Sequence, residues 1–380
     1  MAPRVAIIAD DLTGALDAAA PFAARGLATR VAVTGGDLDA ALAHKPAVVA
    51  VNTATRHADA GTAAAQAGAC AERLAALRPA LLFKKIDSTL RGPVGAELAE
   101  ILGIVEWRAL LCPAVPDQGR SVRAGRLLLD GRPLRETAAA QDGRSIVAED
   151  DLTALLGPAL GDVRAVAQGA TWPDSGHLVV DAETGADLAA IAKRVLSKEG
   201  PWLAAGAAGL SEALAEAAFG PRQPVGAPPP VPPALFILGS RNARTQAQVA
   251  ALDARGVFRA DAAVELPLPA GDLVLTVPHG NGAAGGCRDP DAVAAELAAR
   301  ARQLLPEMQP GLLVVTGGDT AQALLNALHV TALEVLDEVR PGIVRARLAV
   351  DGRDVTLIGK AGGFGSDTLF AELADWCRAA

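Results

Sequence analysis

The chain has 380 residues, of which 51% are hydrophobic and 21% are charged, with a net charge of −8 and a pI near 5.3. This length suits two domains and this composition is globular. The acidic balance argues against a nucleic-acid-binding protein, which would carry a basic face. An acidic protein that handles anionic ligands must gather its Lys and Arg residues locally, so local basic clusters are the features to look for.

The four cysteines form no CxxC pair and the five histidines are scattered. We therefore expect free thiols in a reducing cytosol and no structural zinc site. The N-terminal apolar run Val5–Ala9 is too short for a signal sequence, and no stretch approaches the length of a membrane span. The sequence thus predicts a soluble, cytoplasmic protein with neither a membrane nor a nucleic-acid partner.

Short apolar runs alternate with Ala-rich segments of helical periodicity such as 61–77, 187–196 and 291–305. Continuous, non-alternating runs are typical of strands buried on both faces of a parallel sheet. The pattern predicts an α/β protein with two domains, each with a mostly parallel sheet flanked by helices. The runs are 5–9, 47–51, 80–83, 109–111, 178–180, 235–238, 273–277 and 312–315.

A proline-rich stretch marks the clearest boundary, because seven of the thirteen residues in Pro221–Pro233 are proline. Such a stretch cannot form a regular helix and favours an extended conformation. We predict a first domain at 1–220, a linker at 221–233 and a second domain at 234–380. A surface loop within a single domain is the alternative.

The first apolar run leads into Asp10–Ala15, which reads DDLTGA. Ligands of parallel sheets bind at the carboxyl ends of the strands. Two adjacent carboxylates there are costly unless they are solvated, paired or functional. They could orient a polyol, hold Mg²⁺ or accept a hydroxyl proton. The alternative is that Asp10 or Asp11 caps the following helix.

Polar loops follow three further runs, at 52–56 (NTATR), 84–93 (KKIDSTLRGP) and 112–120 (CPAVPDQGR). Lys and Arg can pair with a substrate carboxylate, and Asp87 can accept hydrogen bonds from hydroxyls. Together the loops predict a pocket for a small hydroxylated acid, although a solvated charged turn remains the alternative for 84–93. The candidate substrate-binding residues are Asp10, Thr13, Asn52, Thr53, Arg56, Lys85, Ser88, Arg91 and Gln118.

The second half differs, because its strand ends are rich in glycine, at 316–321 (TGGDTA) and 359–366 (GKAGGFGS). Backbone amides at such a helix start favour an anion, and glycine allows a phosphate to approach closely. With Gly239 and Ser240 these turns would suit a nucleotide. A tight structural turn is the alternative for each of them.

Two common nucleotide motifs are disfavoured. Gly280–Gly285 matches GxGxxG, but two residues separate it from the preceding run and the expected ribose-binding acid is missing. No GxxxxGK[ST] occurs, since the stretch around Gly359 and Lys360 lacks both the upstream Gly and the following Ser or Thr. Neither a Rossmann dinucleotide site nor a P-loop is therefore expected.

These residues resemble the four-carbon acid sugar kinase family, once known only as a domain of unknown function. The resemblance spans most of the chain, and DDLTGA together with KIDSTLRG carries most of it. The other matching stretches are NTATR, CPAVP with GR at 119–120, GAAGL at 206–210, LGS at 238–240, TGGDTA and GGFG at 362–365.

The resemblance implies ATP-dependent phosphorylation of an acid such as threonate, erythronate or 3-oxo-tetronate, with Mg²⁺. It implies an acid-sugar-binding N-terminal domain, an ATP-binding C-terminal domain and a ligand cleft between them. Asp11, Arg56, Asp87 and Arg91 resemble the acid-sugar side. The residues that resemble the family's ATP contacts are Ser240, Gly317, Gly318, Asp319, Thr320, Gly362, Gly363, Phe364 and Gly365.

Two departures from the family pattern, at 137–151 and at 360–363, leave the substrate identity open. In the expected reaction a substrate hydroxyl attacks the γ-phosphorus of Mg-ATP, and Asp11 or Asp87 is the catalytic base. Arg91 and Lys85 would pair with the substrate carboxylate. A non-catalytic sensor relative and, more remotely, a dehydrogenase are the alternatives, and a homo-oligomer is one option for assembly.

Overall fold

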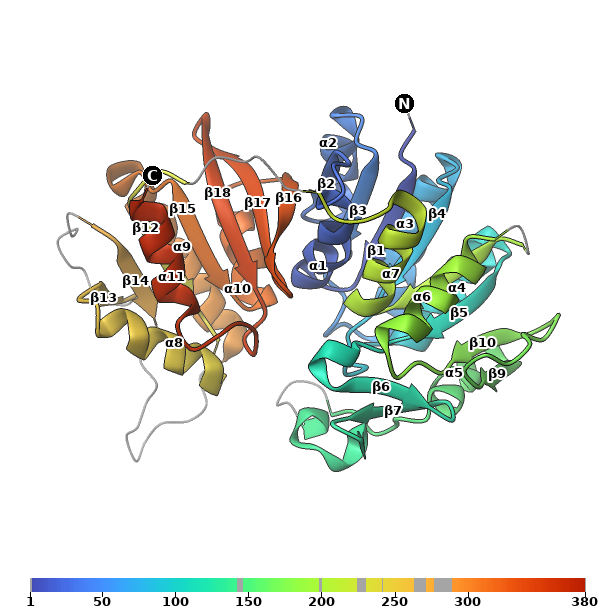
Figure 1. Ribbon diagram of the computed structural model, residues 1–380. Helices are drawn as coiled ribbons and strands as arrows, with labels where there is room; N and C mark the ends of the chain where they lie inside the picture. Colours follow the sequence, from blue (N-terminus) through green and yellow to red (C-terminus); the bar gives the residue numbers. More distant parts are fainter. Residues whose placement is uncertain are drawn as a thin grey trace. The chain divides into compact units, whose positions relative to one another are not determined.

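The chain divides into two units, Met1–Gln223 and Pro224–Ala380. The computed structural model describes residues 2–141, 146–197, 200–223, 230–240, 242–262, 271–276 and 289–379. Positions 224–229 of the predicted linker and the GxGxxG match at 280–285 lie outside these residues. Each unit is an α/β structure and is described by itself (Figure 1).

The N-terminal unit is built on a parallel sheet whose neighbouring strands all run in the same direction. Its central strands are buried along their whole length, which explains their continuous apolar sequences. In spatial order the strands are β2 (Thr29–Ala32), β3 (Val48–Asn52), β1 (Val5–Ala9), β4 (Leu81–Lys85), β11 (Trp202–Gly206), β5 (Arg108–Cys112), β10 (His177–Val180) and β9 (Val163–Val166).

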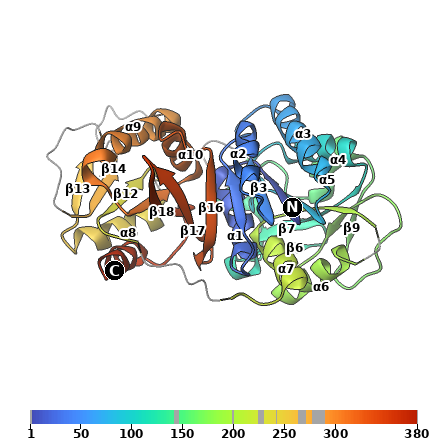
Figure 2. The ribbon, with the colours of Figure 1, turned by 90° about the horizontal axis from the view of Figure 1, so that it is seen from above.

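Helices cover both faces of this sheet (Figure 2). One face carries α1 (Leu12–Ala23), α7 (Ala208–Phe219) and α6 (Gly185–Val195), and the other carries α3 (Ala60–Ala76), α4 (Val94–Val105) and α5 (Leu152–Leu160). The short α2 (Leu38–Ala43) follows β2. After β5 the chain forms a small antiparallel sheet of β6 (Arg120–Arg123), β7 (Arg126–Leu129) and β8 (Arg132–Pro133), which the sequence analysis did not predict.

The C-terminal unit has a mixed sheet. In the spatial order given below, the strands from β13 across to β18 are parallel to their neighbours. Strand β17 is antiparallel to both β18 and β16. Helices α9 (Pro290–Met308) and α10 (Gly318–Ala327) lie on one face, and α8 (Ala243–Asp253) and α11 (Leu369–Arg378) on the other (Figure 2). The strand order is β13 (Phe258–Asp261), β14 (Leu273–Thr276), β12 (Ala234–Leu238), β15 (Leu312–Thr316), β18 (Arg353–Lys360), β17 (Ile343–Val350) and β16 (Ala332–Arg340).

The predicted α/β class with mostly parallel sheets and flanking helices is confirmed. Cys70, Cys112 and Cys377 are free and buried, as expected, and Cys287 lies outside the described residues. Burial raises the pKa of Cys112 to about 12, so its thiol stays protonated and inert at neutral pH.

Candidate functional site

The carboxyl ends of β1, β3 and β4 lie side by side in the N-terminal unit. Ala9 pairs with Asn52 on one side and with Lys85 on the other. The three loops that leave these strands therefore start at the same level of the sheet. They bring together Asp10, Asp11, Arg56, Asp87 and Arg91, which we call the acidic cluster.

Arg56 is the centre of the acidic cluster. Its Nε and Nη2 atoms donate to the two carboxylate oxygens of Asp10, each at 2.9 Å. Its Nη1 atom lies 2.6 Å from Asp11 Oδ2 and 3.8 Å from Asp87 Oδ1. One guanidinium, only 11% exposed, thus links three carboxylates from two loops. Without it the three negative charges would repel one another in a buried site.

Asp87 is held by its own loop as well as by Arg56. Its carboxylate accepts bidentate hydrogen bonds from Arg91 Nε and Nη2, both at 2.9 Å. The main-chain N–H and the hydroxyl of Thr89 also donate to Asp87. This cradle fixes the carboxylate in one orientation, which is the property that a hydroxyl-binding group needs.

The three carboxylates of the acidic cluster have different electrostatics. Burial raises the pKa of Asp10, but Arg56 and Lys84 outweigh it and the pKa ends below its ordinary value. Burial outweighs Arg56 at Asp11, where the charge of Asp10 adds to it, so the pKa of Asp11 is raised. At Asp87 burial is overcome by Arg56 and Arg91, and the pKa falls well below its ordinary value. Asp11 is therefore the strongest proton acceptor of the three.

Asp11 also caps helix α1, since its Oδ1 accepts a hydrogen bond from Gly14 N at 2.7 Å. The helix-cap alternative is therefore correct for Asp11, and it coexists with the contact to Arg56. Gly14 is close-packed here, because a Cβ atom at this position would lie 2.5 Å from Asp11 Oδ1. The tight turn after β1 thus requires glycine.

A buried ion pair lies next to the acidic cluster and was not predicted from the sequence. Lys84 Nζ lies 2.9 Å from Glu97 Oε2, and both side chains are at most 1% exposed. Glu97 also accepts a hydrogen bond from Thr55 Oγ1 at 2.7 Å, and the Thr55 hydroxyl lies 2.6 Å from that of Thr53. The spacing of Lys84 and Glu97, on β4 and α4, gave no signal because charged residues are common on helices.

Several predicted substrate-binding residues stabilise the loops. Asn52 bonds to Val33 O and to the N–H of Ala54, and Thr53 donates to Ala9 O. Lys85 Nζ donates to Ile86 O at 3.0 Å and lies 3.8 Å from Asp17. Thr13 and Ser88 are partly exposed at the same end of the sheet.

The loop after β5 reaches the same edge of the sheet. Gly206 of β11 pairs with Lys85 on one side and with Cys112 on the other, so β4, β11 and β5 end together. The loop carries Gln118, whose Oε1 and main-chain O accept hydrogen bonds from Arg120 Nη1 at 3.1 and 2.9 Å. The predicted residue Gln118 therefore orients an arginine.

The glycine-rich turns of the C-terminal unit also meet at one edge. Thr316 pairs with Leu238 on one side and with Lys360 on the other, so the loops after β12, β15 and β18 start together. Gly317 is the N-cap of α10 with φ of 91°, a conformation that disfavours other residues. We call the loops 239–240, 317–320 and 361–365 the glycine edge. It contains every predicted nucleotide-binding residue.

Two glycines of the glycine edge are closely packed against hydroxyl groups. A Cβ atom at Gly362 would lie 2.2 Å from Ser240 Oγ, and one at Gly239 would lie 2.1 Å from Thr320 Oγ1. The edge thus combines main-chain N–H groups with the hydroxyl groups of Ser240 and Thr320. Such groups at a helix start suit the oxygens of a phosphate.

A buried lysine holds the last turn of the glycine edge. Lys360 Nζ donates to Ala361 O at 3.1 Å, Gly362 O at 2.9 Å and Thr245 Oγ1 at 3.3 Å. Gln248 Nε2 donates to Phe364 O at 3.0 Å. These bonds fix the position of the turn.

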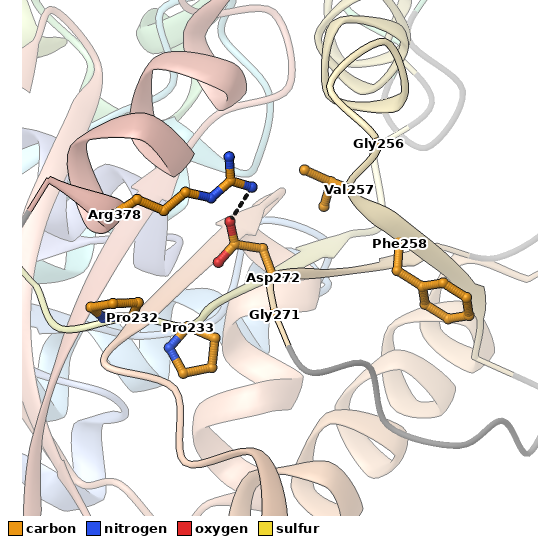
Figure 3. Close-up of a pocket in the computed structure, with 8 residues that line it drawn as sticks. All are labelled: Pro232, Pro233, Gly256, Val257, Phe258, Gly271, Asp272 and Arg378. Atoms are coloured by element: carbon orange, nitrogen blue, oxygen red, sulfur yellow. Dashed lines mark ion pairs between the residues drawn. The ribbon is translucent and has the colours of Figure 1, made fainter.

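A pocket of about 420 Å³ lies at the opposite end of the C-terminal sheet, next to the starts of β12, β13 and β14 (Figure 3). Asp272 pairs with Arg378 at 2.7 Å and accepts from Ala234 N at 2.8 Å in its wall. Ligands of parallel sheets bind at the carboxyl ends of the strands, so this pocket is not the nucleotide site.

The described residues contain no group of three or more His, Cys, Asp or Glu side chains suited to hold a metal ion. In the part of the chain that the structure describes, no helix is both long and apolar enough to cross a bilayer.

Comparison with known proteins agrees with the two-part organisation. Residues 5–214 match a family model described as a sugar-binding N-terminal domain, and residues 279–370 match one described as a nucleotide-binding C-terminal domain. A D-threonate kinase of Bordetella bronchiseptica is 32% identical over 99% of this chain and 98% of its own. The chain belongs to the four-carbon acid sugar kinase family.

Other members of the family are similarly close. A D-threonate kinase of Salmonella typhimurium is 29% identical over 97% of both chains, and a 3-oxo-tetronate kinase of Methylobacterium radiotolerans is 29% identical over 99% of both. The predicted family and the prediction that the protein is a kinase are therefore confirmed. The match spans 99% of this chain.

Solved structures support the fold. A Bordetella bronchiseptica protein with a domain of unknown function, crystallised with citrate as a domain-swapped dimer, is 31% identical and covers 100% of this chain and 99% of its own, with a TM-score of 0.52. A Salmonella typhimurium protein described as a putative tRNA synthase is 20% identical over 97% of this chain and 98% of its own, with a TM-score of 0.76. At that identity the second likeness bears on the fold alone.

Proposed function

We propose that this kinase uses ATP to phosphorylate a hydroxyl of a four-carbon sugar acid of the threonate, erythronate or 3-oxo-tetronate type. The names of the full-length relatives support this substrate class. The observation that carries the proposal is the acidic cluster, where three carboxylates and two guanidinium groups converge at one sheet edge. Residues 1–220 would bind the acid and residues 234–380 would bind ATP, on either side of a linker at 221–233.

The acid side would bind hydroxyl groups through fixed carboxylates. Asp10 and Asp87 are both held bidentately by arginines, so their oxygens are already oriented. Thr13 and Ser88 supply partly exposed hydroxyls beside them. Lys85 adds positive charge. Asn52 and Thr53 would act by shaping the loop that carries Arg56.

We assign the role of catalytic base to Asp11 in preference to Asp87. A base works best when its pKa approaches the operating pH, and burial with the charge of Asp10 raises the pKa of Asp11. The pKa of Asp87 is held well below its ordinary value, and its carboxylate already accepts hydrogen bonds from Arg91 and Thr89. Asp87 would therefore orient the substrate.

The glycine edge would bind the phosphates of ATP. Main-chain amides at 318–320, 362–363 and 365, with Ser240, would contact the phosphate oxygens, as in other helix-start anion sites. The amides of Gly317 and Phe364 already donate to Lys360 O and Ala361 O and would shape the edge. Mg²⁺ needs only one or two protein carboxylates when nucleotide phosphates supply its other ligands. The absence of a carboxylate cage among the described residues therefore fits Mg²⁺ that enters with the nucleotide.

The reaction is a transfer of the γ-phosphoryl group. The substrate hydroxyl oxygen forms a bond to the γ-phosphorus, the bond from that phosphorus to the bridging oxygen breaks, and ADP leaves. Asp11 accepts the hydroxyl proton. Positioning and charge neutralisation supply most of the acceleration in such reactions. The predicted cleft between the domains, where the two ligands would meet, stays a prediction.

A coupled assay of ADP release tests the proposal. Threonate, erythronate and their 3-oxo forms are supplied separately with Mg-ATP, and we expect ADP release that depends on at least one acid. Product analysis by mass spectrometry should show the added phosphoryl group. If no acid stimulates ADP release above the background, the sensor alternative replaces the kinase reaction for this chain.

The assembly and the location are part of the proposal. The domain-swapped dimer of the Bordetella protein supports a homo-oligomer, which light scattering would measure. The citrate in that structure supports a carboxylate-bearing ligand. A cytoplasmic location stays a prediction of the sequence.

A further inference from the structure

The Arg and Lys side chains in and around the acidic cluster already have partners within the protein. Arg56 contacts three carboxylates, and Arg91 donates two N–H groups to Asp87. Lys84 is paired with Glu97, and Lys85 donates to a main-chain oxygen. These cations hold the carboxylates that would bind hydroxyl groups. The expected carboxylate of the substrate thus needs another positive group.

Arg120, at the start of β6, has a different environment. Its Nη1 atom donates to the main-chain and side-chain oxygens of Gln118, two residues away. Its Nε atom is buried and has no hydrogen-bond partner among the described residues. No described carboxylate forms an ion pair with it within 4.0 Å. A buried donor without a partner costs free energy, and an incoming acceptor would recover it.

Arg120 lies close to the acidic cluster. The charges of Asp87, Asp130 and Arg91 act on its guanidinium, although burial is the largest influence and lowers the pKa of Arg120. The loop reaches this position because Gly206 and Gly209 leave no room for side chains. A Cβ atom at Gly206 would lie 2.4 Å from Cys112 O, and one at Gly209 would lie 2.4 Å from Ala114 O. The close approach of the loop therefore explains the two glycines of the GAAGL stretch at 206–210.

We propose that Arg120 binds the carboxylate of the acid substrate and makes the enzyme prefer acids over neutral polyols, an inference that rests on the proposed function. A guanidinium presents parallel N–H groups that match the two oxygens of a carboxylate. Gln118 holds the guanidinium through its Nη1 atom, which leaves Nε for the substrate carboxylate. A neutral polyol would leave the buried Nε atom without an acceptor, and such an unpaired group discriminates strongly between similar ligands.

Two measurements test this assignment in Arg120→Gln and Arg120→Lys. The first is calorimetric titration with threonate and erythronate without nucleotide, and the second is kcat/KM for these acids and for threitol and erythritol. We expect Arg120→Gln to weaken acid binding by roughly 100-fold, because a charge-assisted bidentate contact is lost. The kcat/KM values for the polyols should change less than threefold. Arg120→Lys should recover part of the acid binding.

The control is Arg123→Gln, on the same strand. Arg123 is 62% exposed and pairs with exposed Glu183, so its replacement should leave acid binding unchanged. Thermal unfolding and nucleotide binding confirm that each variant is folded. Acid affinity within threefold of the wild type in Arg120→Gln overturns the inference, and so does an equal loss for acids and polyols. Acid binding without ADP release refutes the proposed function alone, while no binding of any acid by the wild type refutes both.

Discussion

The acidic cluster and the glycine edge both lie at the carboxyl ends of strands, but they are built from different chemical groups. The acidic cluster consists of charged side chains that are bonded to one another across loops from β1, β3 and β4. The glycine edge consists mainly of closely packed glycines and main-chain amides from loops after β12, β15 and β18. Side chains can distinguish one arrangement of hydroxyls from another, whereas main-chain amides suit the phosphate common to all nucleotides. Under the proposed function, the first region would supply specificity and the second would bind phosphate.

The largest effect should come from Asp11→Asn. Amide oxygen keeps the helix cap but cannot accept a proton at neutral pH, so we expect kcat to fall by roughly 10²–10⁴. Nucleotide affinity should stay within twofold of the wild type. Steady-state ADP release and nucleotide titration measure the two effects. Asp87→Asn should mainly raise the KM for the acid.

Asp59→Asn is the matched control for Asp11→Asn. Asp59 is the exposed N-cap of α3 and accepts from Thr62 N at 2.9 Å, as Asp11 does from Gly14 N. The control should keep full activity. If Asp11→Asn retains near-normal kcat while Asp87→Asn loses it, the two carboxylates exchange roles.

Arg56→Met tests whether the acidic cluster depends on one cation. The replacement leaves three carboxylates close together with their main counter-charge removed, so we expect a loss of about 3–5 kcal/mol in the free energy of unfolding. Urea unfolding followed by the signal of the N-terminal unit measures it. Arg73→Met is the control, because Arg73 pairs with an 87% exposed Asp39, and exposed pairs contribute about 0–1 kcal/mol. Equal losses in both variants would contradict the central role of Arg56.

Gly362→Ala tests the glycine edge. The new methyl group would lie 2.2 Å from Ser240 Oγ, so the Ser240 side chain or the turn itself must shift. We expect the KM for ATP to rise about 10–100-fold, because a small misplacement of positioning groups is costly. The KM for the acid should change little. Gly271→Ala, which has no atom within 4 Å of the added Cβ, is the control, and a similar rise there would refute the argument.

Much of the fold followed from short apolar runs. Residues 5–9 and 312–315 are continuous and buried, which identified them as central strands and placed functional loops at their ends. The antiparallel strand β16 was missed because buried Leu333 and Val335 alternate with half-buried residues, a weaker pattern than a continuous apolar run. The loops that carry functional residues are therefore predicted best where the strand before them is fully buried.

The candidate site was only partly visible in the sequence. Asp10, Asp11, Arg56 and Asp87 could be grouped because they follow strands, but their pairing depends on loop conformation. Ala54 and Leu90 have φ values of 56° and 62°, which are unusual for non-glycine residues and cannot be read from residue type. The buried pair of Lys84 and Glu97 and the unpaired Nε of Arg120 likewise arise from tertiary packing.

The smallest effect concerns Lys360, which contrasts with the cations of the acidic cluster because no described carboxylate pairs with it. Burial and the charge of Arg244 lower the pKa of Lys360 from 10.5 to about 8. Between these values the unfolded chain binds the proton and the folded chain does not, so stability rises with pH in this window and levels off below pH about 8.

Lys360→Met removes this titration. As pH rises from about 8 to about 10, the free energy of unfolding of the wild type should increase relative to the variant, by up to about 1.4 kcal/mol per pH unit. Urea unfolding of both proteins at several pH values measures the difference. Lys193→Met, at an exposed position of α6, should show no such trend. A constant difference between the wild type and Lys360→Met would mean that Lys360 keeps its proton throughout, and that the glycine edge carries a permanent positive charge beneath its amides.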